Sequence, residues 1–500
     1  MSVSLLLEMA VSADPDRVAV VDGNVRLTTA QLSELSDGGA RVIDQAGVRS
    51  VVYLGVGGAM LPLLTFASAR AGRPLTPLNY RLSEQTLAEL IARVPDPLIV
   101  ADQEYLSLLA TADHNVVTSH DFLTACRSAE PMHGVADGED VSIVLFTSGT
   151  TSRPKAVELT HGNLMAYVTG TVEFASAADT DAALVCVPPY HIAGVGAAMS
   201  NLYAARKIVY LTRFDPREWL RLVEVESVTT ATVVPTMLDR IVTVLESEPR
   251  ELPSLRTLAY GGAKVSLPLL RKALELLPHV GFVNAYGLTE TSSTVSVLTP
   301  EDHRIAVASG EAEVSRRLTS VGQPVPGIEV QIRAADGSVL SAGETGELFV
   351  RGPQVSGRYR EIGSVLDDDG WFPTKDVAMV DNAGYLFLGG RSDDTIIRGG
   401  ENIAPSEIED VLVEHPLVHE VTVVGVEDQE WGQIIVAVVV PEPDTDPTED
   451  ELVAWARAAL RGSRTPDRVV FRDQLPATST GKVLRRLIVE ELEATVSANR

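Results

Sequence analysis

The chain passes from an apolar run to a polar loop at Leu145-Phe-Thr-Ser-Gly-Thr-Thr-Ser-Arg-Pro-Lys155. The apolar residues 141–146 have the length and composition of a buried β-strand. Hydroxyl groups around a glycine, followed by a lysine, supply hydrogen-bond donors and positive charge for a phosphate. A Walker A loop is excluded, because that motif places glycine directly before its lysine and Pro154 stands there. Taken alone, the stretch leaves open a polar turn after a core strand.

The composition excludes several classes of function. With 500 residues, 45% of them hydrophobic, the chain is long enough for more than one buried core. A net charge of −27 opposes binding to nucleic acid or to an anionic membrane surface. Two cysteines are too few for a disulfide framework and lack metal-ligand spacing, which fits a reducing cytoplasm. Residues 51–69 carry no charge, but their glycines and proline favour a buried strand and helix over a transmembrane segment.

The order of apolar patterns predicts the fold class. Short apolar runs alternate with amphipathic helical patterns over roughly the first 300 residues, which predicts an α/β fold of layered, largely parallel sheets flanked by helices. From residue 321 the pattern is β-rich, with short strands separated by turns such as Ala335-Asp-Gly337. The last part of the chain predicts a small α+β domain of roughly a hundred residues.

Five later segments combine glycine or turn residues with polar side chains. They are Ala259-Tyr-Gly-Gly-Ala263, Asn284-Ala-Tyr-Gly-Leu-Thr-Glu290, Gly370-Trp-Phe-Pro-Thr-Lys-Asp376, Gly390-Arg-Ser-Asp-Asp394 and Leu475-Pro-Ala-Thr-Ser-Thr-Gly-Lys482. The second offers an aromatic ring for a base, a hydroxyl for a phosphate and a carboxylate for Mg²⁺. The third and fourth offer a carboxylate and a guanidinium for ribose hydroxyls, and the last presents a single lysine. Each alone is also explained by a strand-to-loop junction or a surface ion pair.

Together these segments resemble the adenylate-forming superfamily, which includes acyl- and aryl-CoA synthetases, nonribosomal peptide adenylation domains and beetle-type luciferases. The resemblance covers essentially the whole chain and extends to four further segments, Pro77-Leu-Asn-Tyr-Arg81, Pro188-Pro-Tyr-His191, Val234-Pro-Thr-Met-Leu238 and Gly346-Glu-Leu348. It implies a large N-terminal AMP-binding domain over residues 1–390, with a β-rich subdomain at about 321–390. A hinge at 391–394 and a mobile C-terminal domain at 395–500 would follow.

The resemblance also implies roles for individual residues toward ATP. The first loop would hold the β- and γ-phosphates through Thr147, Ser148, Gly149, Thr150, Thr151 and Lys155. Thr289 would contact the α-phosphate, and Glu290 would coordinate Mg²⁺. The adenine would lie against Tyr286, in a site completed by Gly261, Gly262, Ala263, Asn284, Ala285 and Gly287. Asp376 and Arg391 would contact the ribose.

Other implied roles concern the acid and the thiol. His191 matches the gate beside the acyl site, although a buried structural histidine is the alternative. Lys482 matches the lysine that bridges the substrate carboxylate and the α-phosphate, and Asp393 falls at the hinge. The loop that contains Arg398, Gly399 and Gly400 would line the tunnel for the pantetheine arm of CoA. The partners implied are a small carboxylic acid, ATP and CoA, with no nucleic acid, and a homodimer is left open.

The sequence departs from the family pattern at a few positions. Ser152 and Ala156 replace glycines of the phosphate loop, and Lys375 replaces the usual glycine before the ribose aspartate. A side chain at a position that needs φ > 0 costs about 1 kcal/mol. Residues 463–466 read Ser-Arg-Thr-Pro where many relatives have Tyr-Lys-x-Pro. These changes put the geometry of the phosphate loop and the rate in doubt more than the class of reaction.

The resulting expectation is an AMP-forming acyl-CoA synthetase of fatty acid metabolism. The acyl pocket is expected to be apolar and to lack a charged partner for an amino group, with a wall formed by Ile192, Val195, Ala197, Ala198, Tyr260 and Ala263. A strip of arginines for CoA phosphates, with a solvated surface as its alternative, is expected at Arg461, Arg464, Arg468 and Arg472. The other functions left open are an acyl-AMP ligase that loads a carrier protein and a nucleotide-binding regulator without turnover.

Overall fold

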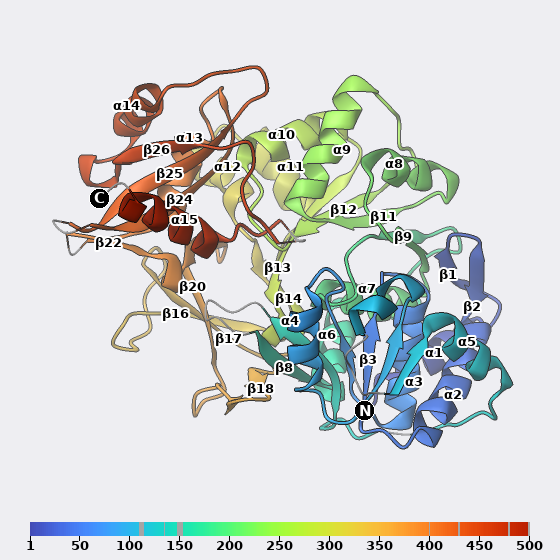
Figure 1. Ribbon diagram of the computed structural model, residues 1–500. Helices are drawn as coiled ribbons and strands as arrows, with labels where there is room; N and C mark the ends of the chain where they lie inside the picture. The colour runs from blue at the N-terminus through green and yellow to red at the C-terminus, as the bar shows by residue number, and fades with distance from the viewer. Residues whose placement is uncertain are drawn as a thin grey trace.

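Four lobes of secondary structure make up the computed structural model (Figure 1). It describes residues 1–109, 115–134, 136–147, 154–399, 401–428, 431–478 and 481–498. Two large sheets occupy the first 300 residues or so, a smaller sheet follows, and the C-terminal segment, orange to red in Figure 1, folds beside them. The α/β architecture predicted from the alternation of apolar patterns is confirmed.

The first large sheet has nine strands in the order β15-β14-β13-β12-β11-β9-β10-β1-β2. Its strands are β1 (Val18–Asp22), β2 (Val25–Thr28), β9 (Ala182–Val185), β10 (Lys207–Tyr210), β11 (Thr230–Val233), β12 (Thr257–Gly261), β13 (Gly281–Leu288), β14 (Ser293–Leu298) and β15 (Gln323–Pro324). The central strands pair in parallel, and antiparallel pairs occur only at the two edges. Its apolar core also includes helices α8 (Pro216–Val225), α9 (Pro235–Ser247), α10 (Leu267–Leu276) and α11 (Pro300–Ala308).

The second large sheet has eight strands in the order β19-β18-β8-β7-β4-β3-β5-β6. They are β3 (Ser50–Leu54), β4 (Leu75–Pro77), β5 (Pro97–Ala101), β6 (Asn115–Thr118), β7 (Val141–Thr147), β8 (Lys155–Thr160), β18 (Arg358–Tyr359) and β19 (Gly363–Ser364). The helices of this half are α1 (Ser4–Ala13), α2 (Thr29–Gln45), α3 (Met60–Ala71), α4 (Glu84–Ile91), α5 (Ser119–Ser128), α6 (His161–Thr171) and α7 (Ile192–Tyr203). Helix α3 is buried from residue 61 to 71, as expected for core. None of the helices in the described ranges is long and apolar enough to cross a membrane.

The rest of the chain forms smaller sheets. An antiparallel sheet contains β16 (Glu329–Arg333), β17 (Thr345–Arg351), β20 (Phe372–Val380) and β21 (Leu386–Arg391). Beyond it lie the hairpin β22 (Ile396–Arg398) and β23 (Glu401–Ile403), and a sheet of β24 (Val418–Asp428), β25 (Gly432–Pro441) and β26 (Arg468–Phe471). Helices α13 (Pro405–Leu412), α14 (Glu449–Ala459) and α15 (Arg485–Ala498) accompany this last sheet. Residues from 396 onward form apolar clusters of their own, which favours the C-terminal domain expected at 395–500.

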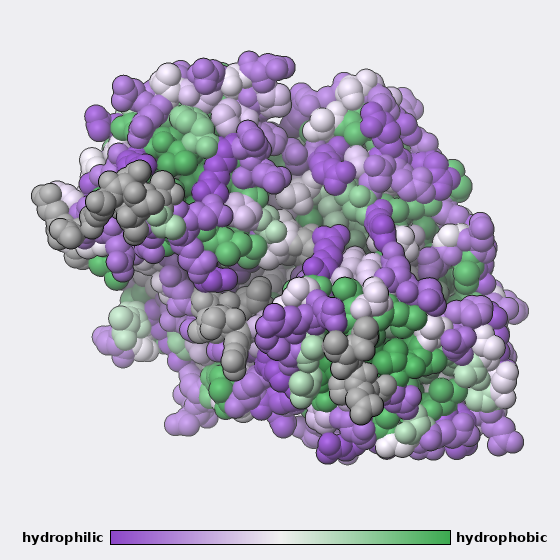
Figure 2. All heavy atoms as spheres, in the orientation of Figure 1, coloured by the Kyte–Doolittle hydropathy of each residue, from purple (hydrophilic) through white to green (hydrophobic). Residues whose placement is uncertain are grey.

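Polar contacts hold the C-terminal segment against the nine-stranded sheet and the small antiparallel sheet. Lys264 Nζ lies 2.5 Å from Asp410 Oδ1, and Ser406 Oγ donates to the carbonyl of Gly389 at 2.7 Å. Gly481 packs so closely that a Cβ there would lie 3.0 Å from Cγ2 of Thr236, at the start of α9. The loop before α15 therefore reaches the ends of the parallel strands of the nine-stranded sheet. The face shown in Figure 2 is mostly hydrophilic, as the high charge content leads one to expect.

Two of the departures from the family pattern fall on described backbone. Lys375 has φ +62°, so this position favours glycine and the lysine is strained there. Its ammonium lies 3.8 Å from Asp393 Oδ2, and Ser392 Oγ donates to its carbonyl at 3.1 Å. Ala156 lies within β8 and is absent from the positive-φ residues of the described chain, so its backbone needs no glycine. Ser152 lies outside the described residues.

Because of the strain at Lys375, we expect glycine to give a more stable protein than valine at this position, the reverse of their usual order. Lys375→Gly should be more stable than Lys375→Val by about 1 kcal/mol, because a β-branched residue fits the left-handed region poorly. Lys272 in α10, whose ammonium pairs with Glu246, is the matched control. There Val should be more stable than Gly, because glycine is the poorer helix former. Thermal unfolding of the four variants tests this, and the same order at both sites would contradict the strain.

Candidate active site

Polar side chains converge where β12 and β13 end, facing β20 and β21. Gly261 pairs with Ala285 across β12 and β13, and a Cβ on Gly261 would lie only 2.3 Å from the Ala285 carbonyl oxygen. Gly262 follows with φ +85°, a conformation that side chains disfavour. Residues 261 and 262 therefore carry no side chain where β12 ends, and glycine is required at both positions.

Asp376 is the most constrained charge of the site. It is 7% exposed and accepts a hydrogen bond from Tyr286 Oη at 2.5 Å. Arg391 is its cross-strand partner between β20 and β21, with Nη1 at 3.4 Å from Oδ1. Burial raises the pKa of Asp376, while Arg391, Tyr286 and Lys482 act to lower it. A buried carboxylate beside a guanidinium suits the two hydroxyls of a ribose.

Lys482 lies within the electrostatic reach of this carboxylate. The surrounding protein removes water from the ammonium and lowers its pKa, and Arg391 lowers it further, whereas Asp376 and Asp394 act to raise it. Lys482 N–H donates to Thr478 Oγ1 at 3.1 Å. Behind the loop, Arg485 pairs with Asp394 at 3.0 Å and with Glu409 at 2.7 Å. Lys482 therefore lies near Asp376 and Arg391, and its role toward the acid and the α-phosphate stays a prediction.

Glu290 provides the carboxylate expected for Mg²⁺. It lies in the short turn Thr289–Thr291 directly after β13 and is 9% exposed. Tyr359 Oη donates to its Oε1 at 2.7 Å. Among the described residues, no group of three or more His, Cys, Asp or Glu side chains is placed to hold a metal. A single carboxylate still fits Mg²⁺, because this ion is usually held by one or two carboxylates together with substrate phosphates.

The two ends of the phosphate loop are described, but its centre is not. Ser148, Gly149, Thr150 and Thr151 lie outside the described residues. Thr147 and Lys155 are paired across the antiparallel strands β7 and β8. The Lys155 ammonium lies 5.4 Å from the centroid of the Tyr359 ring. Lys155 and Glu290 therefore both contact the same tyrosine.

His191 lies at the start of α7, beside Tyr190, whose ring centroid is 4.6 Å away. Burial, followed by the charge of Arg81, lowers the pKa of His191 to about 4, so this imidazole is neutral at neutral pH. A neutral ring at the expected position of the gate can border an apolar acyl group without a charge penalty.

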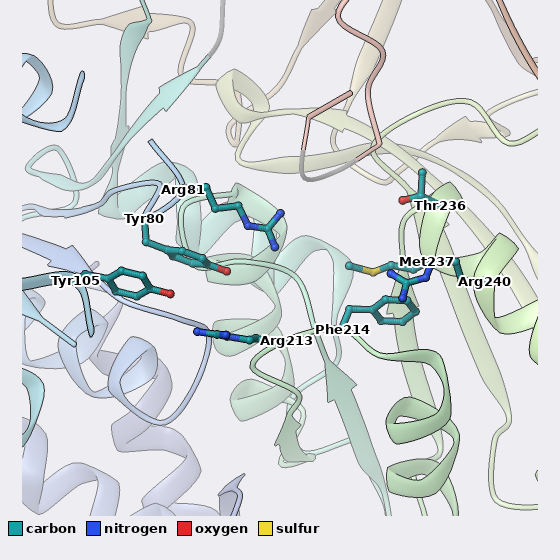
Figure 3. A pocket seen from close by; sticks show the side chains of 8 residues that line it. All are labelled: Tyr80, Arg81, Tyr105, Arg213, Phe214, Thr236, Met237 and Arg240. Atoms are coloured by element: carbon teal, nitrogen blue, oxygen red, sulfur yellow. The ribbon is translucent and has the colours of Figure 1, made fainter. Parts of the chain in front are cut away.

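A basic cavity of about 470 Å³ lies beside the candidate site (Figure 3). It is lined by Tyr80, Arg81, Tyr105, Arg213, Phe214, Thr236, Met237 and Arg240. Thr236 also touches the loop that carries Lys482, so the cavity borders the site. Arg213 pairs with Glu104, whereas Arg81 and Arg240 have no ion-pair partner within the described part of the chain. The cavity thus offers positive charge and aromatic rings in a strongly acidic protein.

Other predicted residues lie elsewhere. Arg398 pairs with Asp467 at 2.5 Å and stacks on Trp431, so its described contacts stay within the C-terminal segment. Gly399 has φ +56° in the adjacent turn, and Gly400 is outside the described residues. Asn284 donates to the carbonyl of Ser320 at 3.1 Å and fixes β13 from the side.

Three residues of the expected acyl wall are buried in the structure. Tyr260 is 2% exposed and its hydroxyl lies 2.9 Å from His303 Nε2, so it belongs to the core of the nine-stranded sheet. Val195 and Ala198 are also fully buried, and Val195 packs in the core of the eight-stranded sheet. Successive strand residues point to opposite faces, so Tyr260 cannot share the exposed side of Gly261. The arginine strip is also partly neutralised, because Arg464 pairs with Glu407 and Arg472 with Glu491.

Sequence reasoning missed Tyr359. Its short segment Gly-Arg-Tyr-Arg follows a strand and carries no motif with an evident chemical role. Its contacts arise from pairing between β8 and β18, about 200 residues apart in sequence, which local patterns do not reveal. The basic cavity was missed for the same reason, since its residues come from four separate segments.

Comparisons with known proteins identify the family of the chain. The family model of AMP-binding enzymes matches residues 7–360, and that of the AMP-binding enzyme C-terminal domain matches residues 407–482. A feruloyl-CoA synthase from Amycolatopsis sp is 35% identical over 94% of this chain and 95% of its own. A fatty acid–[acyl-carrier-protein] ligase from Streptomyces coeruleorubidus is 30% identical over 95% and 93%. The structure of an o-succinylbenzoate-CoA synthetase from Bacillus subtilis, solved with its acyl-adenylate intermediate, has a TM-score of 0.85 and 27% identity, covering 97% of both chains.

The matches span nearly the full length of the chain and of these relatives. The mixed α/β fold agrees with that of the solved relatives. The chain belongs to the AMP-binding enzyme family, within the adenylate-forming superfamily that its sequence resembles.

Proposed function

We propose that this protein is an AMP-forming ligase that activates a compact aromatic carboxylic acid with ATP and transfers the acyl group to CoA. The observation that carries the proposal is that Arg391 and the exposed Lys482 both act on the buried carboxylate of Asp376, close to Glu290. The site places a mobile ammonium beside a ribose-type site and a phosphate-type site. Such an ammonium is positioned where the negative charges of an acid and an α-phosphate would meet.

The first step forms the acyl-adenylate. A carboxylate oxygen of the acid attacks the α-phosphorus of ATP, an O–P bond forms, and pyrophosphate leaves. Lys482 stabilises the charge that accumulates between the two anions, and Asp376 with Arg391 holds the ribose. Glu290 would hold Mg²⁺, which when bound neutralises part of the phosphate charge. Lys155 orients the outgoing phosphates.

The second step transfers the acyl group to a thiol. The sulfur attacks the acyl carbon, the C–S bond forms, and AMP leaves with the bonding electrons of the cleaved C–O bond. The neutral His191 borders the acyl group, and the basic cavity beside it provides positive charge for an anionic thiol substrate. Arg81 and Arg240 suit the phosphates of CoA better than the paired arginines of the C-terminal segment do.

The structure of the expected acyl wall favours a compact acid over a long-chain fatty acid. With Tyr260, Val195 and Ala198 in the two cores, less apolar surface remains to hold a long alkyl chain. Two of the three relatives named above act on aromatic acids by their names, feruloyl and o-succinylbenzoyl. The third is named for a fatty acid and a carrier protein, which keeps carrier loading as the second candidate function.

A panel of acids tests the substrate class. Hydroxycinnamic and other substituted aryl acids should be turned over with a kcat/KM at least about tenfold above that of fatty acids of eight or more carbons, because part of the expected apolar wall is buried in the two cores. The measurement is CoA-dependent release of AMP together with the thioester, by chromatography. Fatty acids as the better substrates would overturn the aromatic assignment. Accumulated acyl-AMP with no thioester until a carrier protein is added would favour the second candidate.

Lys482→Ala separates an enzyme from a nucleotide-binding relative. Pyrophosphate release should fall by about 100-fold or more, because the ammonium acts on charge that develops in the transition state. ATP affinity, measured by calorimetry, should change little. The variant should still form thioester when supplied with synthetic acyl-adenylate. Lys272→Ala on α10 is the control and should match the wild type. Unchanged pyrophosphate release in Lys482→Ala would refute the role of this lysine.

A further inference from the structure

We propose that Tyr359 is a positioning residue that links the magnesium carboxylate Glu290 to the phosphate-facing lysine Lys155. This inference rests on the proposed adenylation and adds a residue to it. Tyr359 contributes its hydroxyl to one group and its ring to the other, so one side chain sets the distance between them.

The hydroxyl fixes the carboxylate. Tyr359 Oη donates to Glu290 Oε1 at 2.7 Å, and Glu290 is 9% exposed. A hydrogen bond to a charged group in such surroundings is stronger than one between neutral groups. With Oε1 held, the carboxylate is restricted to one orientation, and the other oxygen is left to face a ligand. Glu290 then loses less freedom when a metal–nucleotide complex binds.

The ring orients the lysine. Tyr359 lies directly across from Val157 in the pairing of β18 with β8, so Lys155 is its diagonal neighbour on the same face. The Lys155 ammonium is 5.4 Å from the ring centroid, within the range of a cation–π contact. Lys155 is the first residue after the phosphate loop to enter β8, so the ring acts where the loop ends.

The segment that carries Tyr359 is itself anchored to both partners. Ser356 N–H donates to the backbone carbonyl of Glu290 at 2.9 Å. On the other side, Arg360 N–H donates to the carbonyl of Ala156 at 2.9 Å, and Glu361 accepts from the Ala156 N–H at 3.2 Å. The residues before and after the tyrosine therefore tie the Glu290 turn to β8. Because its own backbone is fixed on both sides, Tyr359 holds Glu290 and Lys155 at a set distance from each other.

A matched tyrosine exists outside the site. Tyr385 Oη donates to Asp302 Oδ1 at 2.6 Å and is 7% exposed. It makes the same kind of bond between a phenol and a carboxylate, far from Glu290 in sequence and in no part of the proposed machinery. Replacing each tyrosine by phenylalanine removes one hydroxyl and keeps the ring.

Two substitutions at Tyr359 separate its two contacts. Tyr359→Phe should raise the Mg²⁺ concentration for half-maximal pyrophosphate release roughly fivefold while the KM for ATP at saturating Mg²⁺ stays close to the wild type, since only the carboxylate contact is lost. Tyr359→Ala should raise both. Calorimetric binding of ATP at low and high Mg²⁺ provides a readout independent of turnover. Tyr359→Phe should weaken ATP binding at low Mg²⁺ only, whereas Tyr359→Ala should weaken it at both concentrations. Tyr385→Phe should leave all of these values unchanged.

The outcomes distinguish this inference from the proposed function. If Tyr359→Phe shows the wild-type Mg²⁺ dependence in both assays, the positioning role is wrong although adenylation stands. If both phenylalanine variants lose activity in proportion to a lowered unfolding temperature, the role of Tyr359 is structural and the inference is also wrong. If the wild type releases no pyrophosphate with any acid of the panel, the proposed function itself fails.

Discussion

The arrangement of the site depends on one buried carboxylate, that of Asp376. It is held by the hydroxyl of Tyr286 from the nine-stranded sheet and by Arg391 from the neighbouring strand of the small sheet. An ionised carboxylate is stable in such a place only when it is paired and hydrogen-bonded. Lys482 adds a third positive or donating group from the C-terminal segment. Groups from three parts of the chain therefore act on one charge.

This dependence explains why the remaining features lie where they do. Gly261 and Gly262 have no side chain, and the sequence predicts that a base lies between them and Tyr286. Glu290 comes four residues after Tyr286, just beyond the end of the same strand. The strained Lys375 precedes Asp376 and pairs with Asp393, so backbone strain is stored next to the central carboxylate. Lys155 and Glu290 are joined through Tyr359 on the side where the phosphates would lie.

Much of this could be predicted from the sequence, because the motifs are local. Asp376, Arg391, Tyr286 and Lys482 each stand in a short segment with a recognisable order of glycine and polar residues, and the fold class follows from the alternation of apolar runs. What local patterns do not give is the face on which a residue lies and its distant partners. The sequence does not show that Tyr260 is buried in the core of the nine-stranded sheet, and Tyr359 acquires its contacts only when β18 pairs with β8. The centre of the phosphate loop, including Ser152, remains a prediction.

The central claim is that this site joins the carboxylate of an acid to the α-phosphorus of ATP. Oxygen-18 in the carboxylate tests it most directly. After turnover with labelled acid, CoA and unlabelled ATP, mass spectrometry of the nucleotide should find one ¹⁸O atom in AMP and none in pyrophosphate, because a carboxylate oxygen stays on phosphorus when the thioester forms. Unlabelled AMP, or label in ADP and phosphate instead, would contradict an acyl-adenylate and with it the role given to Asp376, Arg391 and Lys482.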